Sequence, residues 1–257
     1  MKKIIGFIIC FFILGVCNAK ALVINDNFDS SANWVSNGDA AVKLGVGYLT
    51  ENEMFQAGSL WYNSIFDLTK YSTFKVTFDF VLDGFADGIT FSVIDANNGN
   101  DALGYNGGYL GYEGIPNSFA VEFDIFHNSW DPDPNHVGID INGSVESIIT
   151  STNVPNLNDG ALHTATIEFD IINNTINVTV DNFISISNYS LPVELNFSNV
   201  YFGFTGATGA EYAIQYVDNF NLNLSPVPLP SSVILLGCGV LSLIGIKKIK
   251  KINPLYG

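Results

Sequence analysis

Residues that could bind a cation gather in one short stretch, 119–142, which reads FAVEFDIFHNSWDPDPNHVGIDIN. Its first residues alternate with the period of two that is typical of a strand, which places Glu122 and Asp124 on one face. Alternate residues of a strand lie about 7 Å apart, and two like charges at that distance favour a bound cation. The residues after the strand that could complete its shell, in a loop rich in Pro and Asp, are Asn128, Asp131 and His136.

The donor types indicate which ions would fit. Hard oxygen donors suit Ca²⁺, and a site that adds an imidazole to carboxylates suits a transition ion such as Mn²⁺. The alternative is a solvated acidic face with no ligand, which is the usual state of carboxylates on an exposed strand. The length and order of the pattern favour the cation site.

The full pattern is E-x-D-x-F-x-N-x-x-D-P-x-x-x-H-x-G-I-D, from Glu122 to Asp140, and it closely resembles the metal-binding segment of the legume (L-type) lectins. The resemblance implies a transition ion held by Glu122, Asp124, Asp131 and His136. It implies a calcium ion held by Asp124, Asp131, Asn128 and the carbonyl of Phe126, so that the two aspartates bridge both ions.

The resemblance extends to earlier strands, in the same order as in the family: GDAAV (38–42), AGSLWY (57–62) and STFKVTFDFVL (72–82). The last of these alternates apolar and polar residues, as a half-buried antiparallel strand does. With 20 Phe, 11 Tyr, 24 Gly and 14% charged residues, the composition fits an all-β domain. The resemblance implies a concanavalin-A-like jelly-roll sandwich of two large antiparallel sheets, covering residues 20–225.

Residues outside the metal segment acquire a role only through the resemblance. Asp87, in Ala86-Asp87-Gly88, would follow a cis peptide bond and accept hydrogen bonds from sugar hydroxyls; as bare sequence it marks a turn. Gly108 would offer its backbone N–H to the sugar, although a flexible Gly turn explains it equally. Backbone N–H groups of Ala210 and Glu211 would close the site, because residues 209–212 resemble the loop of the mannose/glucose-binding members. Asn128 would donate through its NH₂, and Phe126 would be an apolar platform.

Both ends carry predicted sorting segments. Residues 1–19 have the lysines, apolar run and small-residue exit of a secretory signal peptide, with a lipoprotein signal through Cys17 or a membrane anchor as alternatives. The tail, 226–251, has VPLP, an apolar run at 231–246 and KKIKK, and residues 252–257 follow. It resembles a PEP-CTERM signal of Gram-negative bacteria, which implies cleavage by an exosortase on the way to the surface or matrix. A short transmembrane anchor, or a eukaryotic cargo-receptor lectin with one span, is the alternative.

Charge restricts the partners. Residues 20–226 contain 4 of the 10 lysines and all 25 acidic residues, so their net charge is 4 − 25 = −21. This surface repels nucleic acid and is compatible with neutral glycans, including exopolysaccharide, and with divalent cations. A homodimer is possible in such a family, but no residue decides it. Two of the three cysteines, Cys10 and Cys17, lie in the predicted signal, so no disulfide is expected.

Two other functions compete with that of a lectin. Jelly-roll glycoside hydrolases carry a similar strand, but they need a second glutamate about 5.5 Å from the first, where this chain has Phe126 or His127. We therefore expect no enzyme. A structural or adhesion protein of the matrix could keep the sandwich without sugar affinity, although the set of Asp87, Gly108 and Asn128 argues against it.

Three local predictions concern the rest of the chain. Residues 139–147 are expected to continue as one strand with a bulge at Gly143, which leaves a role for Ser147 beside the metals open. Residues 162–171 and 176–180 are expected to form a hairpin. His163 is interpreted as a structural or exposed histidine.

Overall fold

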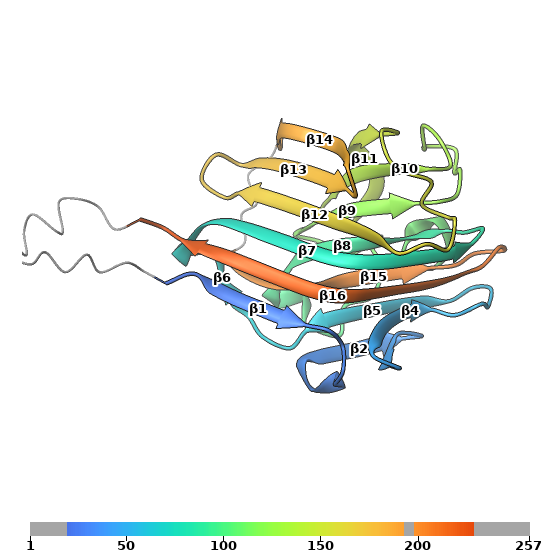
Figure 1. Cartoon of the computed structure of the whole chain (residues 1–257), viewed down its shortest axis with the longest axis horizontal. Coiled ribbons are helices and arrows are strands. Elements are labelled where there is room, and N and C mark those ends of the chain that lie inside the picture. The colour runs from blue at the N-terminus through green and yellow to red at the C-terminus, as the bar shows by residue number, and fades with distance from the viewer. Residues whose placement is uncertain (1–19, 193–197, 229–257) are drawn as a thin grey trace, which may run out of the picture. The chain divides into compact units, whose positions relative to one another are not determined.

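The computed structural model describes residues 20–192 and 198–228, and a compact unit runs from Ala21 to Pro226. The predicted signal peptide and almost all of the predicted tail lie outside the described residues. Within them, the strands form two sheets in which every pairing is antiparallel, as Figure 1 shows. The predicted all-β sandwich of two large antiparallel sheets is confirmed.

The first sheet has eight strands among the described residues and contains both long strands of the fold. In spatial order they are β14 (Phe183–Ser190), β13 (Thr175–Val180), β12 (His163–Asp170), β7 (Tyr71–Gly84), β16 (Ala213–Pro226), β4 (Val46–Thr50) and β3 (Ala41–Lys43), with β1 (Leu22–Asp26) also paired to β16.

The second sheet, also of eight strands in the described part of the chain, carries the cation segment. Its order is β11 (Ser144–Ser151), β10 (His136–Ile141), β9 (Ser118–Asp124), β8 (Gly88–Asp95), β15 (Asn199–Ala207), β5 (Ala57–Tyr62) and β2 (Trp34–Gly38), with β6 (Phe66–Asp67) also paired to β15. Short 3₁₀ turns lie between strands at η1 (Ser31–Asn33), η2 (Leu68–Lys70), η3 (Ala96–Asn98) and η4 (Gly107–Tyr109).

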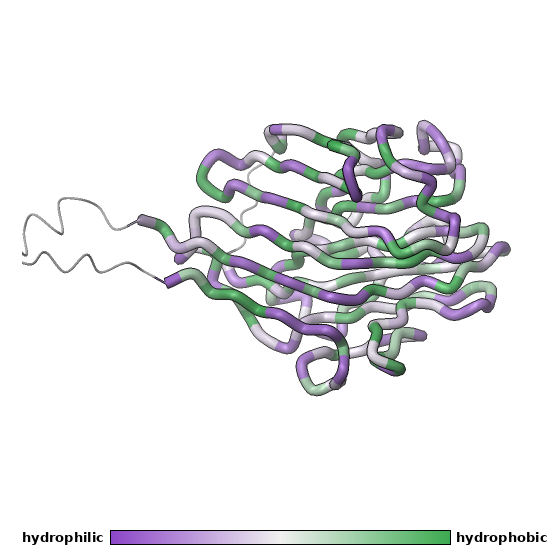
Figure 2. The backbone as a smooth tube through the Cα atoms, in the orientation of Figure 1, coloured by the Kyte–Doolittle hydropathy of each residue, from purple (hydrophilic) through white to green (hydrophobic). Residues whose placement is uncertain are grey.

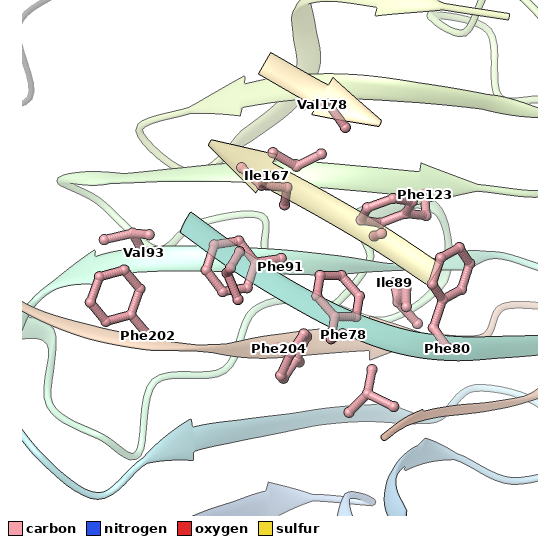
Figure 3. Close-up of a cluster of buried hydrophobic side chains, with 14 of the residues drawn as sticks. Phe78, Phe80, Ile89, Phe91, Val93, Phe123, Ile167, Val178, Phe202 and Phe204 are labelled. Atoms are coloured by element: carbon pink, nitrogen blue, oxygen red, sulfur yellow. The ribbon is translucent and has the colours of Figure 1, made fainter. Parts of the chain in front are cut away.

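Aromatic side chains from both sheets fill the space between them (Figure 3). Phe78 of β7 is fully buried and lies with its ring centroid 4.8 Å from Phe204 of β15 and 5.7 Å from Phe123 of β9. Edge and tilted ring contacts of this kind pack efficiently in a sheet-on-sheet core. The hydropathy of the strands fits this packing. Hydrophobic residues (green) and hydrophilic residues (purple) alternate along the strands in Figure 2.

The hairpin predicted after residue 162 is confirmed as β12 and β13, joined through Asn173 and Asn174. Asn174 has φ 55°, a left-handed conformation that asparagine tolerates in tight turns. His163 at the start of β12 is buried, with Nδ1 2.8 Å from Asp181 and Nε2 3.2 Å from Asp159. The structural interpretation of His163 is therefore correct.

A long connection, residues 96–117, covers the outer face of the second sheet. The carbonyl of Leu110 accepts a hydrogen bond from Thr205 at 2.7 Å, and the carbonyl of Ala102 accepts one from the Trp61 indole at 2.8 Å. These bonds satisfy polar groups of the central strands that the connection removes from water. They also fix the connection where it carries the glycine loop 107–108.

The prediction of a single strand over residues 139–147 is wrong. Asn142 and Gly143, with φ of 60° and 73°, form a tight turn between β10 and β11. Paired left-handed residues are what a two-residue hairpin requires. The extra residues lie in β11. Ile139 pairs with Ile149 and Ile141 pairs with Ser144. Asp140 alone therefore faces residues 145–148. The bulge is in β11, and it includes Ser147.

No helix within the described residues is long and apolar enough to cross a membrane. The segment predicted to do so, 231–246, lies outside those residues.

The aromatic core should dominate the stability of the sandwich. Truncating Phe78 to Ala removes a buried ring from between the sheets and should lower the free energy of unfolding by about 3–5 kcal/mol. Ile184→Ala is the control, because Ile184 is 63% exposed and its loss should change stability by about 0.5 kcal/mol or less. Urea unfolding of both variants measures the difference; equal losses would contradict this account of the core.

Candidate functional site

Asp87 lies between β7 and β8 at one end of the second sheet. The Ala86–Asp87 peptide bond is cis, as the resemblance implied. Backbone hydrogen bonds hold the residue on both sides: its N–H donates to Ala207 at 3.1 Å, and its carbonyl accepts from the N–H of Ile125 at 2.9 Å. The residue is only 3% exposed, and its Oδ2 has no hydrogen-bond partner among the described residues.

Two loops meet beside that carboxylate. The N–H of Gly107 donates to the carbonyl of Thr208 at 3.0 Å, and Gly209 follows directly. A Cβ built on Gly209 would lie 3.2 Å from Asp87 Oδ2 and 3.3 Å from the Cα of Gly107. The small residues therefore bring both backbones to within contact of the Asp87 carboxylate.

Asn128 lies in the loop after β9, next to the glycine loop 107–108 that also lies near Asp87. Its N–H donates to Asp131 Oδ2 at 2.6 Å, and its side-chain Oδ1 is buried without a hydrogen-bond partner in the described chain. A Cβ on Gly108 would lie 2.5 Å from the Asn128 side-chain amide, so only glycine fits this contact. The structure thus brings together the predicted residues Gly108 and Asn128.

Phe126 begins the same loop. Its N–H donates to Asp124 Oδ1 at 2.7 Å, and the residue is half-buried. Asp124 therefore anchors the start of the loop, and Asn135 anchors its end through hydrogen bonds with Pro155 and Leu157.

Glu122 and His136 face each other across β9 and β10, as the pairing of His136 with Asp124 and of Gly138 with Glu122 requires. His136 Nε2 lies 3.1 Å from Glu122 Oε1 and 3.9 Å from Asp131 Oδ1. His136 Nδ1 lies 2.8 Å from the carbonyl of Asp133 and donates to it, so Nε2 donates to Glu122 in the protonated ring and carries a free lone pair in the neutral ring. That tautomer is the one in which Nε2 can bind a cation.

Ser147 joins this group from the bulge in β11. Its hydroxyl lies 2.8 Å from Glu122 Oε1 and 2.7 Å from Asp140 Oδ1. A Cβ on Gly138 would lie 2.0 Å from that hydroxyl and 2.2 Å from Glu122 Oε1. Because Gly138 has no side chain, it leaves room for the side chains of Ser147 and Glu122.

Burial and mutual repulsion perturb the acidic groups. Burial, with the charge of Glu122 second, raises the pKa of Asp124 and of Asp140 well above the usual range. Burial raises the pKa of Asp87 to about 7, with the Gly209 backbone opposing the shift and Asp131 adding to it.

The pKa of Asp131 is also raised, mainly by burial, while the Asn128 N–H and the charge of His136 oppose the shift. Burial alone lowers the pKa of His136, but Glu122 and then Asp131 raise it overall. Three of the four lysines in the described part of the chain do not neutralise this group, because Lys43, Lys70 and Lys75 are paired elsewhere with Glu51, Asp67 and Glu168.

The predicted donors lie together but do not converge on one point. Among residues 20–192 and 198–228, no three His, Cys, Asp or Glu side chains are arranged as a complete metal-binding group. Glu122 and His136 instead contact each other.

Ala210 and Glu211 are both exposed in the turn before β16. The backbone that contacts the Asp87 carboxylate belongs to Gly209, one residue earlier.

Sequence reasoning missed three residues of this site: Gly209, Gly138 and Asp140. Asp140 lies on the same face of β10 as His136 and Gly138, and its Oδ2 is fully buried without a hydrogen-bond partner within the described structure. The period of two in H-x-G-x-D could have identified it, and a glycine inside a strand is itself a sign of close approach.

A family model described as "Legume lectin beta-barrel domain" matches residues 23–220. The chain belongs to the legume lectin family. Favin of Vicia faba is 34% identical over 178 residues, covering 62% of this chain and 73% of favin. A lectin of Lens culinaris subsp. orientalis is 29% identical over 220 residues, covering 74% of this chain and 78% of that one.

Solved lectin structures agree with the match. The lectin from Bauhinia forficata in complex with GalNAc is 26% identical, has a TM-score of 0.66, and covers 80% of this chain and 99% of that one. A peanut lectin solved with a nine-residue peptide is 27% identical with a TM-score of 0.68, covering 82% and 100%. These relatives are lectins, which bind carbohydrate without catalysis, so this chain is a legume-lectin-like carbohydrate-binding protein.

The buried acidic residues of the site predict that the metal-free protein loses stability as pH rises. Asp87 has a folded-state pKa above its ordinary value of 3.8, so the cost of burying its charge grows as pH rises from about 4 to 7. Asp124, Asp131 and Asp140 act in the same direction, and so does His136, whose favourable charge is lost as pH rises through its raised pKa. Unfolding free energy should therefore fall by roughly 3 kcal/mol or more over this window.

Urea unfolding at about pH 4.5 and 7.5 measures this, with Asp87→Asn reducing the fall and the exposed Asp101→Asn leaving it unchanged. Acids with lowered pKa values, such as Asp67, Asp159 and Asp170, lose their contribution only below about pH 4 and do not interfere. A free energy of unfolding that rises over the window, equally in wild type and Asp87→Asn, would contradict the burial argument.

Proposed function

We propose that this protein is a metal-dependent lectin that binds a neutral sugar at Asp87, Asn128 and the backbone of the glycine loops. The observation that supports the proposal is the paired set of buried, unpartnered acceptors: Asp87 Oδ2 and Asn128 Oδ1. A buried acceptor without a partner costs free energy unless a ligand satisfies it. Sugar hydroxyls would donate to Asp87 Oδ2, and a cation would satisfy Asn128 Oδ1.

In this account each protein group makes a defined contact with the sugar or the ion. The Asp87 carboxylate accepts hydrogen bonds from two sugar hydroxyls, and the Asn128 NH₂ donates to the sugar while its Oδ1 faces the metal. Backbone N–H groups of Gly108 and of the loop with Ala210 and Glu211 donate to the same sugar. Phe126 packs against its C–H face.

The donor chemistry supports calcium and a transition ion. Glu122, Asp124, Asp131 and His136 would hold Mn²⁺ or a similar ion, and Asp124, Asp131, Asn128 and the Phe126 carbonyl would hold Ca²⁺. Bound ions would neutralise the negative charge of the buried carboxylates. Their binding would fix the loop of residues 126–135 before the sugar arrives, which lowers the ordering cost of sugar binding.

The sugar class and location are part of the proposal. The loop at 209–212 resembles that of mannose/glucose-binding members, which favours that class. The Bauhinia forficata lectin, by contrast, was solved with GalNAc, so galactose-type sugars are the competing class. The predicted end segments favour a bacterial protein exported to the surface or matrix, transiently anchored by the tail and cleaved by an exosortase. Glycans or exopolysaccharide would be its ligands, and a homodimer remains compatible.

Sugar binding should depend on the Asp87 carboxylate and on metals. The full-length protein, loaded with Ca²⁺ and Mn²⁺, should bind one sugar class on a glycan array and lose that binding after chelation. Asp87→Ala should lose binding by at least about 100-fold, since several charge-assisted hydrogen bonds disappear together. Asp101→Ala, which removes an exposed carboxylate, is the matched control. A folded, metal-loaded protein that binds no glycan would instead indicate a structural matrix protein.

The two ions should be separable by mutation. Calorimetric titration should find two ions per chain in the wild type, none in Asp124→Asn, which changes the bridging ligand, and calcium alone in His136→Ala. His127→Ala is the matched control, because this exposed histidine lies in the same loop. Retention of the Mn²⁺ site in His136→Ala would refute the assigned ligands.

A further inference from the structure

Gln215 of β16 is a polar side chain inside the sandwich. It is fully buried, and its neighbours on the same face of the strand, Ala213 and Val217, belong to the hydrophobic core. Its side-chain Oε1 has no hydrogen-bond partner among the described residues. A buried acceptor of this kind costs free energy, and a methionine of similar length would fill the space without that cost. Packing alone therefore does not account for the amide.

The nitrogen of the same amide faces the backbone behind the candidate site. Nε2 donates to the carbonyl of Ala207 at 2.8 Å and, over a longer contact of 3.3 Å, to the carbonyl of Ala86. Two carbonyl acceptors fix which end of the amide is the donor. Ala86 lies just before β8 and Ala207 ends β15, so one side chain connects the two segments from inside the core.

Both carbonyls belong to the backbone that holds Asp87. The Ala86 carbonyl is in the same peptide unit as the Asp87 N–H, and that N–H donates to the Ala207 carbonyl at 3.1 Å. The Ala207 carbonyl therefore accepts from Asp87 and from Gln215 at once. Two residues beyond Ala207 is Gly209, whose backbone lies against the Asp87 carboxylate. Gln215 thus contacts both of the segments whose spacing defines this part of the site.

The surroundings of Gln215 hold it in place. A Cβ on Gly206 would lie 3.0 Å from Gln215 Oε1 and 2.9 Å from the Cβ of Leu49, so the glycine leaves room for the amide. Gln215 pairs with Thr50 of β4, and the Thr50 hydroxyl donates to the carbonyl of Ala213 at 2.9 Å. The strand is therefore fixed beside Gln215, which gives Nε2 a defined position.

We propose that Gln215 is a positioning residue, which sets the Asp87 carboxylate at its distance from the Gly209 backbone without touching the ligand. This inference rests on the proposed sugar site and deepens it. A site held in its binding geometry before the sugar arrives loses less free energy on ordering. Its consequence is that a change inside the core, out of reach of any sugar, lowers sugar affinity.

The test replaces Gln215 by methionine, which keeps the length of the side chain and removes its donors. Calorimetric titration of the full-length protein, loaded with Ca²⁺ and Mn²⁺, would use glucose, mannose and galactose. In Gln215→Met the affinity for the sugar that the wild type binds should fall about tenfold, the effect expected for one lost hydrogen bond. The number of ions bound should not change, because Gln215 contacts none of the proposed ion ligands.

Val217→Ala is the matched control for a general weakening of the core. Val217 is fully buried on the same face of β16, so its truncation should lower the midpoint of urea unfolding. The sugar affinity of the folded protein should stay that of the wild type. Gln215→Met removes one unpartnered acceptor and exposes another, the Ala86 carbonyl, so its midpoint should change little.

Nuclear magnetic resonance reads the positioning without a sugar. The Asp87 N–H should exchange with solvent about tenfold faster in Gln215→Met, because its acceptor Ala207 loses a second partner. The Ile171 N–H, which donates to Ser72 at 2.8 Å, should not change. In the wild type, saturating sugar should shift the Gln215 side-chain NH₂ signal, although that side chain is fully buried; this measurement needs no variant.

The outcomes separate the two proposals. Wild-type sugar affinity in Gln215→Met, unchanged exchange of the Asp87 N–H, or no shift of the Gln215 NH₂ signal in the sugar-bound wild type would overturn the positioning role and leave the lectin function intact. An equal loss of affinity in Val217→Ala would also overturn it, since a weaker core would then explain both variants. Failure of the metal-loaded wild type to bind any sugar would overturn both proposals.

Discussion

Repulsion among buried carboxylates is the interaction on which the rest of this structure depends. Glu122, Asp124, Asp87 and Asp140 are each 3% exposed or less. The charge of Glu122 adds to burial in raising the pKa of Asp124 and of Asp140. The sandwich can bury them because its aromatic core is large, its strands place Glu122, Asp124 and Asp140 on the outer face of the second sheet, and Asp87 lies just before β8. Removing these charges from water without neutralising them is costly. Cations are the simplest compensation, and in this account they convert an unfavourable group into a rigid sugar site.

A period of two predicted the half-buried strand at 72–82 and the shared face of Glu122 and Asp124, while the two-sheet sandwich and the candidate ion ligands were predicted from the resemblance to the legume lectins. Alternation in 72–82 placed Phe78 inward, and E-x-D on β9 placed Glu122 and Asp124 together, which the pairing of β8, β9 and β10 bears out. The bulge was misplaced because the turn at Asn142 and Gly143 can be read as a continuing strand. Contacts between distant residues, such as that of Gly209 with Asp87, leave no periodic signal. Only the folded chain brings them together.

The site is assembled from loops that the sheets hold rigidly. The connection over residues 96–117 is bonded to the outer face of the second sheet through Leu110 and Ala102, which fixes Gly108. The loop after β9 is bonded to Asp124 at its start and, through Asn135, to Pro155 and Leu157 at its end. Within its middle, the Asn128 N–H donates to Asp131, one of the residues expected to hold the ions. One half of the site is therefore positioned by the protein alone. In the proposed function, ions bound at Asp124 and Asp131 would fix the middle of the other loop, so ions that need not touch the sugar would control its binding.

The most direct test of this account is a crystal structure of the protein with Ca²⁺ and Mn²⁺, with anomalous scattering used to locate the ions. The account predicts two ions between β9 and the loop after it. One should lie about 2.3–2.6 Å from oxygens of Asp124, Asn128 and Asp131, and the other should contact Glu122 and His136 Nε2. A well-ordered structure with no ion there, and with Glu122 still bonded to His136, would contradict it.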